Sequence, residues 1–119
     1  MTILLLFALL LAYGCGMFLP LFFPNRPHIQ NVIAHGSAAF AGGLGIALGL
    51  IGLLAPHPLV LSLPSSIPLL TFSLLLDSLA GFFVLTISLV VLAVSVFANG
   101  YVRDFYERIP VSLLGLLYN

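Results

Sequence analysis

The side chains of this chain that could carry acid–base chemistry are few. The sequence has three arginines, three carboxylates and three histidines, and no lysine. Asp77, Asp104 and Glu107 flank long apolar runs, and His35 is the one acidic or basic side chain inside such a run. A proton relay through hydrocarbon needs ionisable groups at depth, usually with partners. The sequence therefore predicts no proton path within this chain.

His35 has two interpretations. A histidine can change its charge near neutral pH, so it could exchange protons. It also lies about one turn after the predicted start of the second apolar run, at headgroup depth, where a histidine needs no functional explanation. The interfacial interpretation is favoured.

Other candidate sites do not assemble. His28 and His57 are predicted to lie in loops on opposite sides of a membrane, so the histidines cannot share a metal ion. A lone cysteine, Cys15, can form neither an intrachain disulfide nor a metal cage. The remaining candidates are a possible triad of Ser65 or Ser66 with Asp77 and His57, and a glycine cluster from Gly42 to Gly45. The triad lacks a nucleophile elbow, and the glycines lie inside an apolar run and not after a strand. We therefore expect no catalytic, cofactor-binding or metal-binding residue, and no small-molecule substrate.

The composition explains why so few polar groups are present. Of the 119 residues, 62% are hydrophobic and 5% are charged, and the mean hydropathy is +1.31. A soluble domain has about a quarter of its residues charged. This composition excludes a water-soluble globule and predicts an integral membrane protein whose solvent is the lipid bilayer. The net charge is zero and the arginines are scattered, so there is no basic patch for nucleic acid.

The apolar runs predict an all-α membrane protein with three transmembrane helices and the start of a fourth. A run of about 20 apolar residues can cross the hydrocarbon, and prolines interrupt helices. The N-terminal run lacks the positive region of a secretory signal, because no Lys or Arg precedes Arg26. The expected segments are helix 1–23, loop 24–31, helix 32–55, hairpin or loop 56–78, helix 79–100, loop 101–109 and a truncated fourth helix at 110–119.

Small residues recur along the second run at intervals of three and four. They are Ala34, Ala38, Ala41, Gly42, Gly45, Gly49 and Gly52. In lipid, such a strip allows two helix backbones to approach closely. The strip predicts that this helix packs inside a bundle, and a dedicated dimerisation motif is the less favoured alternative.

The segment between the second and third runs contains four prolines and cannot be one helix. Residues Leu59 to Leu63 and Leu70 to Leu74 have the apolar alternation of strands, and Pro64 to Pro68 has turn chemistry. These features predict a β-hairpin over the membrane face of the protein. A greasy loop without strand pairing is the alternative.

The third run has clear boundaries. Asp77 or Ser78 can cap its start, and Gly100 can end it. The polar side chains inside it are Thr86, Ser88 and Ser95. Each hydroxyl can bond to the carbonyl one turn earlier, so we interpret the three as packing residues.

The arginines predict the orientation. Arg26, Arg103 and Arg108 all lie in the first and third connections, and the second connection has none. The positive-inside rule therefore places those two loops in the cytoplasm, and the N-terminus and hairpin outside, in a multi-pass protein of the inner membrane. After Pro110 the apolar run is nine residues long, about half of a span, so we expect the chain to be part of a longer protein or a split-gene product.

Three motifs resemble one protein family. They are Leu76-Asp77-Ser78-Leu79-Ala80-Gly81-Phe82-Phe83, the helix end from Val94-Ser95 to Gly100-Tyr101-Val102-Arg103, and Leu116-Leu117-Tyr118-Asn119. Together they resemble the N-terminal part of the antiporter-like, proton-pumping membrane subunits. Such subunits occur in respiratory complex I, in multisubunit sodium/proton antiporters, and in formate hydrogenlyase and hydrogenase-4 complexes. The resemblance covers residues 69–119; Ala80 replaces the usual serine, and the helix end from Ala98 to Val102 departs from the pattern.

The resemblance implies a role without chemistry. Family members move protons along buried Lys and Glu residues of later helices, which this chain does not contain. It therefore implies a non-catalytic N-terminal segment of a membrane oxidoreductase or hydrogenase complex, partnered by other membrane subunits, with the hydrogenase branch slightly preferred. The alternative is a self-contained small membrane scaffold or assembly protein.

Overall fold

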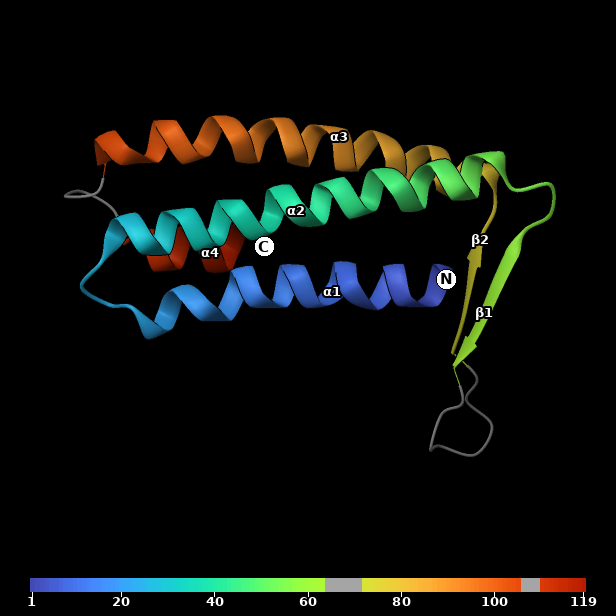
Figure 1. Cartoon of the computed structure of the whole chain (residues 1–119), viewed down its shortest axis with the longest axis horizontal. Coiled ribbons are helices and arrows are strands. Elements are labelled where there is room, and N and C mark those ends of the chain that lie inside the picture. The colour runs from blue at the N-terminus through green and yellow to red at the C-terminus, as the bar shows by residue number, and fades with distance from the viewer. Residues whose placement is uncertain (64–71, 106–109) are drawn as a thin grey trace.

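The computed structural model describes residues 1–63, 72–105 and 110–119. Within them the chain forms helix α1 (Thr2–Phe18), the 3-10 helix η1 (Leu19–Phe22), helix α2 (Pro27–Leu54), strands β1 (Leu59–Leu63) and β2 (Phe72–Leu76), helix α3 (Ser78–Tyr101), the 3-10 helix η2 (Val102–Phe105) and helix α4 (Val111–Tyr118). Figure 1 shows α1, α2 and α3 side by side, with the hairpin at one end and the short α4 toward the other.

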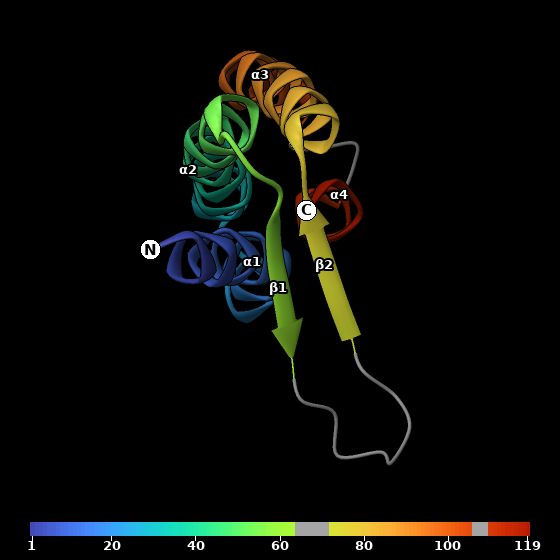
Figure 2. The same cartoon turned by 90° about the vertical axis from the view of Figure 1, so that its right-hand side faces the viewer.

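Three helical stretches are long and apolar enough to cross a membrane: Thr2–Phe22, Pro27–Leu54 and Ser78–Asp104. Their number and order are as predicted. The chain reverses direction between successive helices, so the N-terminus lies at the hairpin end of the molecule (Figures 1 and 2). The start of α2 and the end of α3 lie together at the opposite end.

The first loop is shorter than predicted, because α2 begins at Pro27 and not at residue 32. The predicted loop 24–31 contains Pro27 as one of the prolines that interrupt helices. Pro27 instead occupies the first turn of the second helix, where its missing N–H is not needed and its φ angle already suits a helix. The loop is fastened by Gln30, whose Nε2 donates to the Phe23 carbonyl at 2.9 Å. The first helical stretch changes to a 3-10 turn around Pro20 and ends at Phe22, one residue before the predicted end.

Helix α2 lies at the centre of the bundle and contacts α1, α3 and α4. Its predicted strip of small residues is buried along its whole length, which confirms that this face packs against other helices. Helix α1, by contrast, has Gly16 as its one buried residue. The fold is therefore organised around one helix, and its neighbours leave most of their own apolar surface uncovered.

The start of α3 is capped as predicted. The Asp77 side chain accepts a hydrogen bond from the Ala80 N–H at 2.7 Å, so Ser78 is the first helical residue. The predicted stop at Gly100 is wrong, because α3 continues to Tyr101 and then tightens into η2. Gly100 does not take the left-handed conformation that makes a glycine stop, and the Val102 N–H bonds back to the Ala98 and Gly100 carbonyls.

The hairpin was one of two interpretations of segment 56–78, and β1 and β2 do pair antiparallel. The register joins Leu59 to Leu76 and Leu63 to Phe72. The second strand therefore lies two residues later than predicted, because pairing across the ladder recruits Leu75 and Leu76 although they break the alternation. The predicted turn at Pro64 to Pro68 lies outside the described residues, as do Glu107 and Arg108.

Helix α4 begins at Val111, one residue later than predicted, and Pro110 is extended and serves as its N-cap. Val111 and Gly115 are its buried residues. The short helix packs against α2, α1 and η1, toward the end of the bundle away from the hairpin (Figure 1).

Candidate functional site

Polar side chains gather inside the bundle where α4 meets α2 and α3. This buried polar cluster consists of Asn31 and His35 of α2, Ser95 and Asn99 of α3, and Tyr118 and Asn119 at the end of α4. Asn31 is fully buried, and Ser95 and His35 are 1% and 5% exposed. Buried polar groups are costly unless they find partners, so these contacts decide what the cluster can do.

Asn31 and Asn99 join α2 to α3 near the end of the bundle. The Asn31 Nδ2 donates to the Asn99 backbone carbonyl at 2.8 Å and to the Asn99 Oδ1 at 3.1 Å. Asn99 lies in the last turn of α3, where backbone carbonyls lack hydrogen-bond partners within the helix. The pair therefore closes an orphaned helix end with a side chain from the neighbouring helix.

Tyr118 and Ser95 join α4 to α3. The Ser95 hydroxyl donates to the Val91 carbonyl at 2.7 Å, and the Tyr118 hydroxyl lies 3.0 Å from the Ser95 oxygen and 3.3 Å from that same carbonyl. Ser95 bonds back along its own helix, as we predicted for the hydroxyls of this run, and so does Thr86 to Phe82 at 2.9 Å. Ser95 does more than pack, since it also holds the phenol of another helix.

Asn119 joins α4 to α2. Its Nδ2 donates to the Ala34 carbonyl at 3.1 Å and to the Gly115 carbonyl at the same distance. Gly115 lies so close to Ala34 that an added Cβ would stand 2.8 Å from the Ala34 methyl group. Asn119 also presses on α1, because its Oδ1 would lie 2.6 Å from a Cβ placed on Gly16. The last turn of α4 is therefore fixed by hydrogen bonds and by the absence of side chains around it.

His35 lies under the ring of Tyr118. The two ring centroids are 5.0 Å apart and the planes meet edge to face at 63°. The Nδ1 atom of His35 is buried and has no hydrogen-bond partner. Because α2 begins at Pro27, His35 is about 12 Å along the helix axis from its first residue, at 1.5 Å per residue. His35 thus lies about two turns into α2 and not one turn, because the helix starts five residues earlier than predicted. Its depth relative to the lipid headgroups stays a prediction.

The chemistry available to this cluster is limited to hydrogen bonding and proton exchange. Its members are amides, hydroxyls and one imidazole, with no carboxylate or thiol among them. In the part of the chain that the structure describes, no three His, Cys, Asp or Glu side chains come close enough to hold a metal ion. The cluster also has no base positioned to activate a nucleophile, because His35 accepts no proton from Ser95 or Tyr118 in the observed hydrogen bonds.

The other residues singled out in the sequence are dispersed. His28 lies in the first turn of α2 and His57 follows its last, so the two stand at opposite ends of the helix. Cys15 is exposed on the outer face of α1. Ser65 and Ser66 lie outside the described residues. The Gly42 to Gly45 cluster lies within α2, where Gly42 and Gly45 pack against α3. It therefore does not form a phosphate-binding loop.

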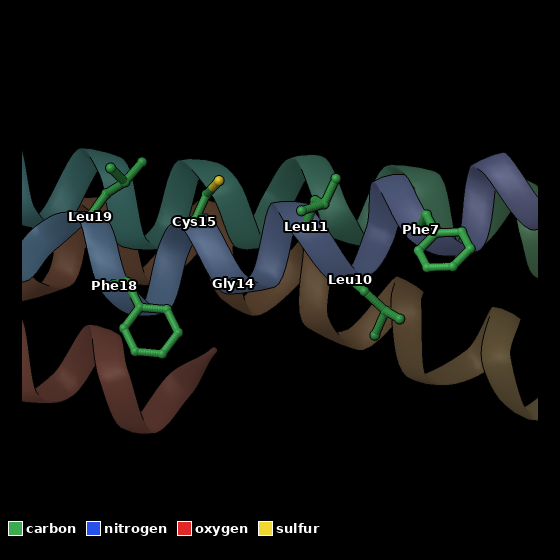
Figure 3. A pocket seen from close by; sticks show the side chains of 7 residues that line it. All are labelled: Phe7, Leu10, Leu11, Gly14, Cys15, Phe18 and Leu19. Carbon is green, nitrogen blue, oxygen red and sulfur yellow. The ribbon is translucent and has the colours of Figure 1, made fainter. Parts of the chain in front are cut away.

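Two apolar hollows lie away from the cluster. One is a groove along the outer face of α1, lined by Phe7, Leu10, Leu11, Gly14, Cys15, Phe18 and Leu19 (Figure 3). The other is a cavity of about 190 Å³ beneath the hairpin, lined by Thr2, Leu6, Leu48, Leu74, Leu75, Leu76, Ala80 and Val84. Neither offers a charged group to orient a ligand. Both are hydrophobic surface of the kind that lipid or another helix covers.

Sequence reasoning missed the buried polar cluster, although a signal existed. Asn31 and His35 are four residues apart, as are Ser95 and Asn99, so each pair lies on one helix face. Two of the partner residues, Tyr118 and Asn119, come from α4, which is too short to be recognised as a packed helix. Comparisons of the chain with protein-family models, with curated proteins and with solved structures found no match.

Proposed function

We propose that this chain is the N-terminal structural segment of an antiporter-like, proton-translocating membrane subunit, in a complex I-related oxidoreductase or a membrane-bound hydrogenase. In this role α1, α2 and α3 cross the inner membrane, and the residues that carry protons belong to other helices. The chain supplies packing surface and the external hairpin, and other membrane subunits of the complex are its partners.

The observation that carries the proposal is the role of the motif residues in the fold. Asp77 caps α3, and Gly81 lies against α2 so closely that an added Cβ would be 2.5 Å from the Leu53 nitrogen. Tyr118 and Asn119 fasten α4 to α3 and α2. Several of the positions that resemble the family thus take part in joining these helices. These motif residues have structural roles in capping and helix packing, which supports the resemblance beyond similarity of sequence alone.

The uncovered apolar surface supports a membrane partner role. Large hydrophobic side chains are exposed along α1 and α3, for example Leu4 at 74%, Leu11 at 67% and Phe97 at 72%. In water such surface would cause aggregation, whereas lipid or another transmembrane helix covers it without loss. The small residues that favour close helix contact are already used within the chain by α2. The free faces of α1 and α3 are therefore the ones available to neighbouring subunits.

The orientation makes a direct prediction. If Arg26 and Arg103 face the cytoplasm, a cysteine at position 57 is labelled from outside by a membrane-impermeant maleimide and one at position 25 is not. Both sites are exposed in the fold. His57→Cys and Asn25→Cys are made in a Cys15→Ala background and tested in intact cells, with permeabilised cells as the control. Labelling of position 25 and not 57 would contradict the proposed orientation.

Membership of a complex is tested with the tagged chain expressed from its own chromosomal locus. After extraction in a mild detergent, native electrophoresis with quantitative mass spectrometry is expected to find it in a large assembly. That assembly is expected to contain a membrane subunit with buried Lys and Glu residues and a redox subunit, in fixed ratio to the tagged chain. Migration alone or as a small homo-oligomer would favour the self-contained scaffold instead.

A further inference from the structure

We propose that His35 is a proton-binding site which communicates with water at one end of the bundle only, the end where α2 begins. The ligand is a proton, delivered and withdrawn by water along the same route. This inference goes beyond the proposed function, because it concerns the chain's own interior and holds whether or not the chain belongs to a larger complex.

The geometry at Nδ1 is the first reason. The side chain of His35 is only 5% exposed, and its Nδ1 atom is buried without a hydrogen-bond partner. A buried polar atom of this kind is uncommon and indicates a strained, functional or water-bound group. A histidine placed only for packing would be replaceable by leucine, which fills a similar volume without an unsatisfied nitrogen. Nδ1 is therefore the atom at which the proposed proton binds.

The surroundings of His35 offer hydrogen bonds but no fixed charge. The ring of Tyr118 of α4 packs on His35, and Tyr118 is in turn bonded to Ser95 of α3. Asn99 of α3 bonds to Asn31, one turn before His35 on α2. The titratable groups on the elements packed against α2 are Tyr13 and Cys15 of α1, Tyr118 of α4, Asp77 and Tyr101 at the two ends of α3, and Arg103 and Asp104 of η2. No described carboxylate contacts the ring. Proton uptake at His35 therefore requires water to reach it, since nothing in the described contacts neutralises an imidazolium.

The second reason is that polar groups lead to His35 from one side. Gln30 and Asn31 precede it on α2, both buried, and Asn99 lies across from Asn31. Beyond His35, toward the hairpin, the same face of α2 presents Ala38, Ala41, Gly42 and Gly45. There α3 approaches so closely that the backbone of one helix meets the other, with Ser88 as the one buried hydroxyl. Water thus has hydrogen-bonding groups to follow as far as His35 and not past Ser88.

The proton balance is simple. A hydronium ion or water donates a proton to the unprotonated ring nitrogen, and the conjugate base leaves by the polar route. The reverse step returns the proton to the same side. No other bond forms or breaks.

Hydrogen exchange at the histidine ring tests the proposal. The hydrogen on the carbon between the ring nitrogens exchanges with D₂O only when the ring takes up a proton and meets solvent base, and mass spectrometry resolves each histidine. The full chain in lipid nanodiscs is compared at several pH values, with the exposed His28 and His57 as internal references. We expect a sigmoidal pH dependence at His35 and a rate within about a hundredfold of the references. A rate slower than this, or one that does not vary with pH, overturns the proposal.

Two variants test the route. Asn99→Leu removes the side-chain acceptor of Asn31, leaves the backbone carbonyl of residue 99 in place, and puts an apolar side chain on the polar path. It is therefore expected to slow exchange at His35 about tenfold. Ser88→Ala changes the opposite half of the interface and is expected to leave the rate unchanged. Global unfolding of either variant would raise the His35 rate to that of the exposed His28 and His57, so a His35 rate below the references shows that the variant is folded. Slowing by Ser88→Ala and not by Asn99→Leu would overturn the one-sided access.

Discussion

The two halves of α2 pack by different chemistry. In the half near the hairpin, Gly49 and Gly52 face Gly81 and Leu85 of α3, and an added Cβ on Gly49 would lie 2.6 Å from the Leu85 nitrogen. In the other half, Asn31 and its neighbours meet α3 and α4 through side-chain hydrogen bonds. One helix therefore has a glycine half, where backbones touch, and a polar half, where side chains join.

The difference shows how a bundle with almost no charged residues obtains specificity. Lipid and leucine are equally apolar, so burial alone cannot choose which helix faces meet. In the glycine half, the backbones of α2 and α3 approach more closely than larger side chains would allow. In the polar half, each buried donor or acceptor needs a hydrogen-bond partner at one particular position. The consequences are separable: bulk should break the glycine half, and loss of a donor should weaken the polar half.

The largest effect is expected from bulk in the glycine half. Gly49→Leu places a side chain against the Leu85 backbone, which cannot move aside as a flexible side chain could. Overpacking of this kind costs about 1–3 kcal/mol and often more where backbone must shift. Equilibrium unfolding by SDS in mixed micelles should show a loss at or above the top of that range.

The matched control is Gly43→Leu, on the same helix. Gly43 is exposed, and nothing lies within 4 Å of a Cβ placed there. Leucine has a better helix propensity than glycine by roughly 0.5–1 kcal/mol, so this variant should be neutral or slightly more stable. Equal destabilisation by both variants would mean that the glycine face of α2 is not where α3 packs.

A smaller loss is expected when the polar half loses a donor. Asn31→Ala leaves the Asn99 carbonyl groups without the Asn31 amide and opens space in a fully buried position. An unsatisfied buried group costs about 1–3 kcal/mol. The same micelle titration measures it, with Val32→Ala, which is 43% exposed, as the control. A cost for Asn31→Ala no greater than that of Val32→Ala would remove the distinction between the halves.

The glycine half could be predicted from the sequence, whereas the polar half is visible there only as two same-face pairs, Asn31 with His35 and Ser95 with Asn99. Small residues at intervals of three and four are a local pattern, and all seven of those predicted on α2 are buried. The cluster depends on residues 68 and 85 positions apart, as in the bonds from Asn31 to Asn99 and from Asn119 to Ala34. No periodicity reports such pairs. The late start predicted for α2 also placed His35 at its edge, because Pro27 was interpreted as a breaker and not as a first-turn residue.

Tyr118→Phe sharpens the comparison further. The phenol oxygen is lost from Ser95 and from the Val91 carbonyl, but Ser95 keeps its own bond to that carbonyl. No buried donor is left without a partner there, so the expected loss is about 0.5–1.5 kcal/mol, the net value of one hydrogen bond. The ring still covers His35. A loss comparable to that of Gly49→Leu would mean that α4, and not the glycine half, holds the bundle together.

The smallest expected effect is on ion flux, which should be zero. The polar half gives water a route to His35 from one end, but the glycine half closes the way to the other with apolar residues and backbone contacts. A bare charge crossing that half faces a barrier of at least several kcal/mol. The chain alone in liposomes is therefore expected to move neither protons nor sodium above empty vesicles, measured with an internal pH dye under an imposed potential. Wild type and His35→Ala should be indistinguishable. Proton flux that disappears in His35→Ala would contradict the closed glycine half and make the histidine part of a complete path, whereas flux that persists in that variant would place the path elsewhere in the chain.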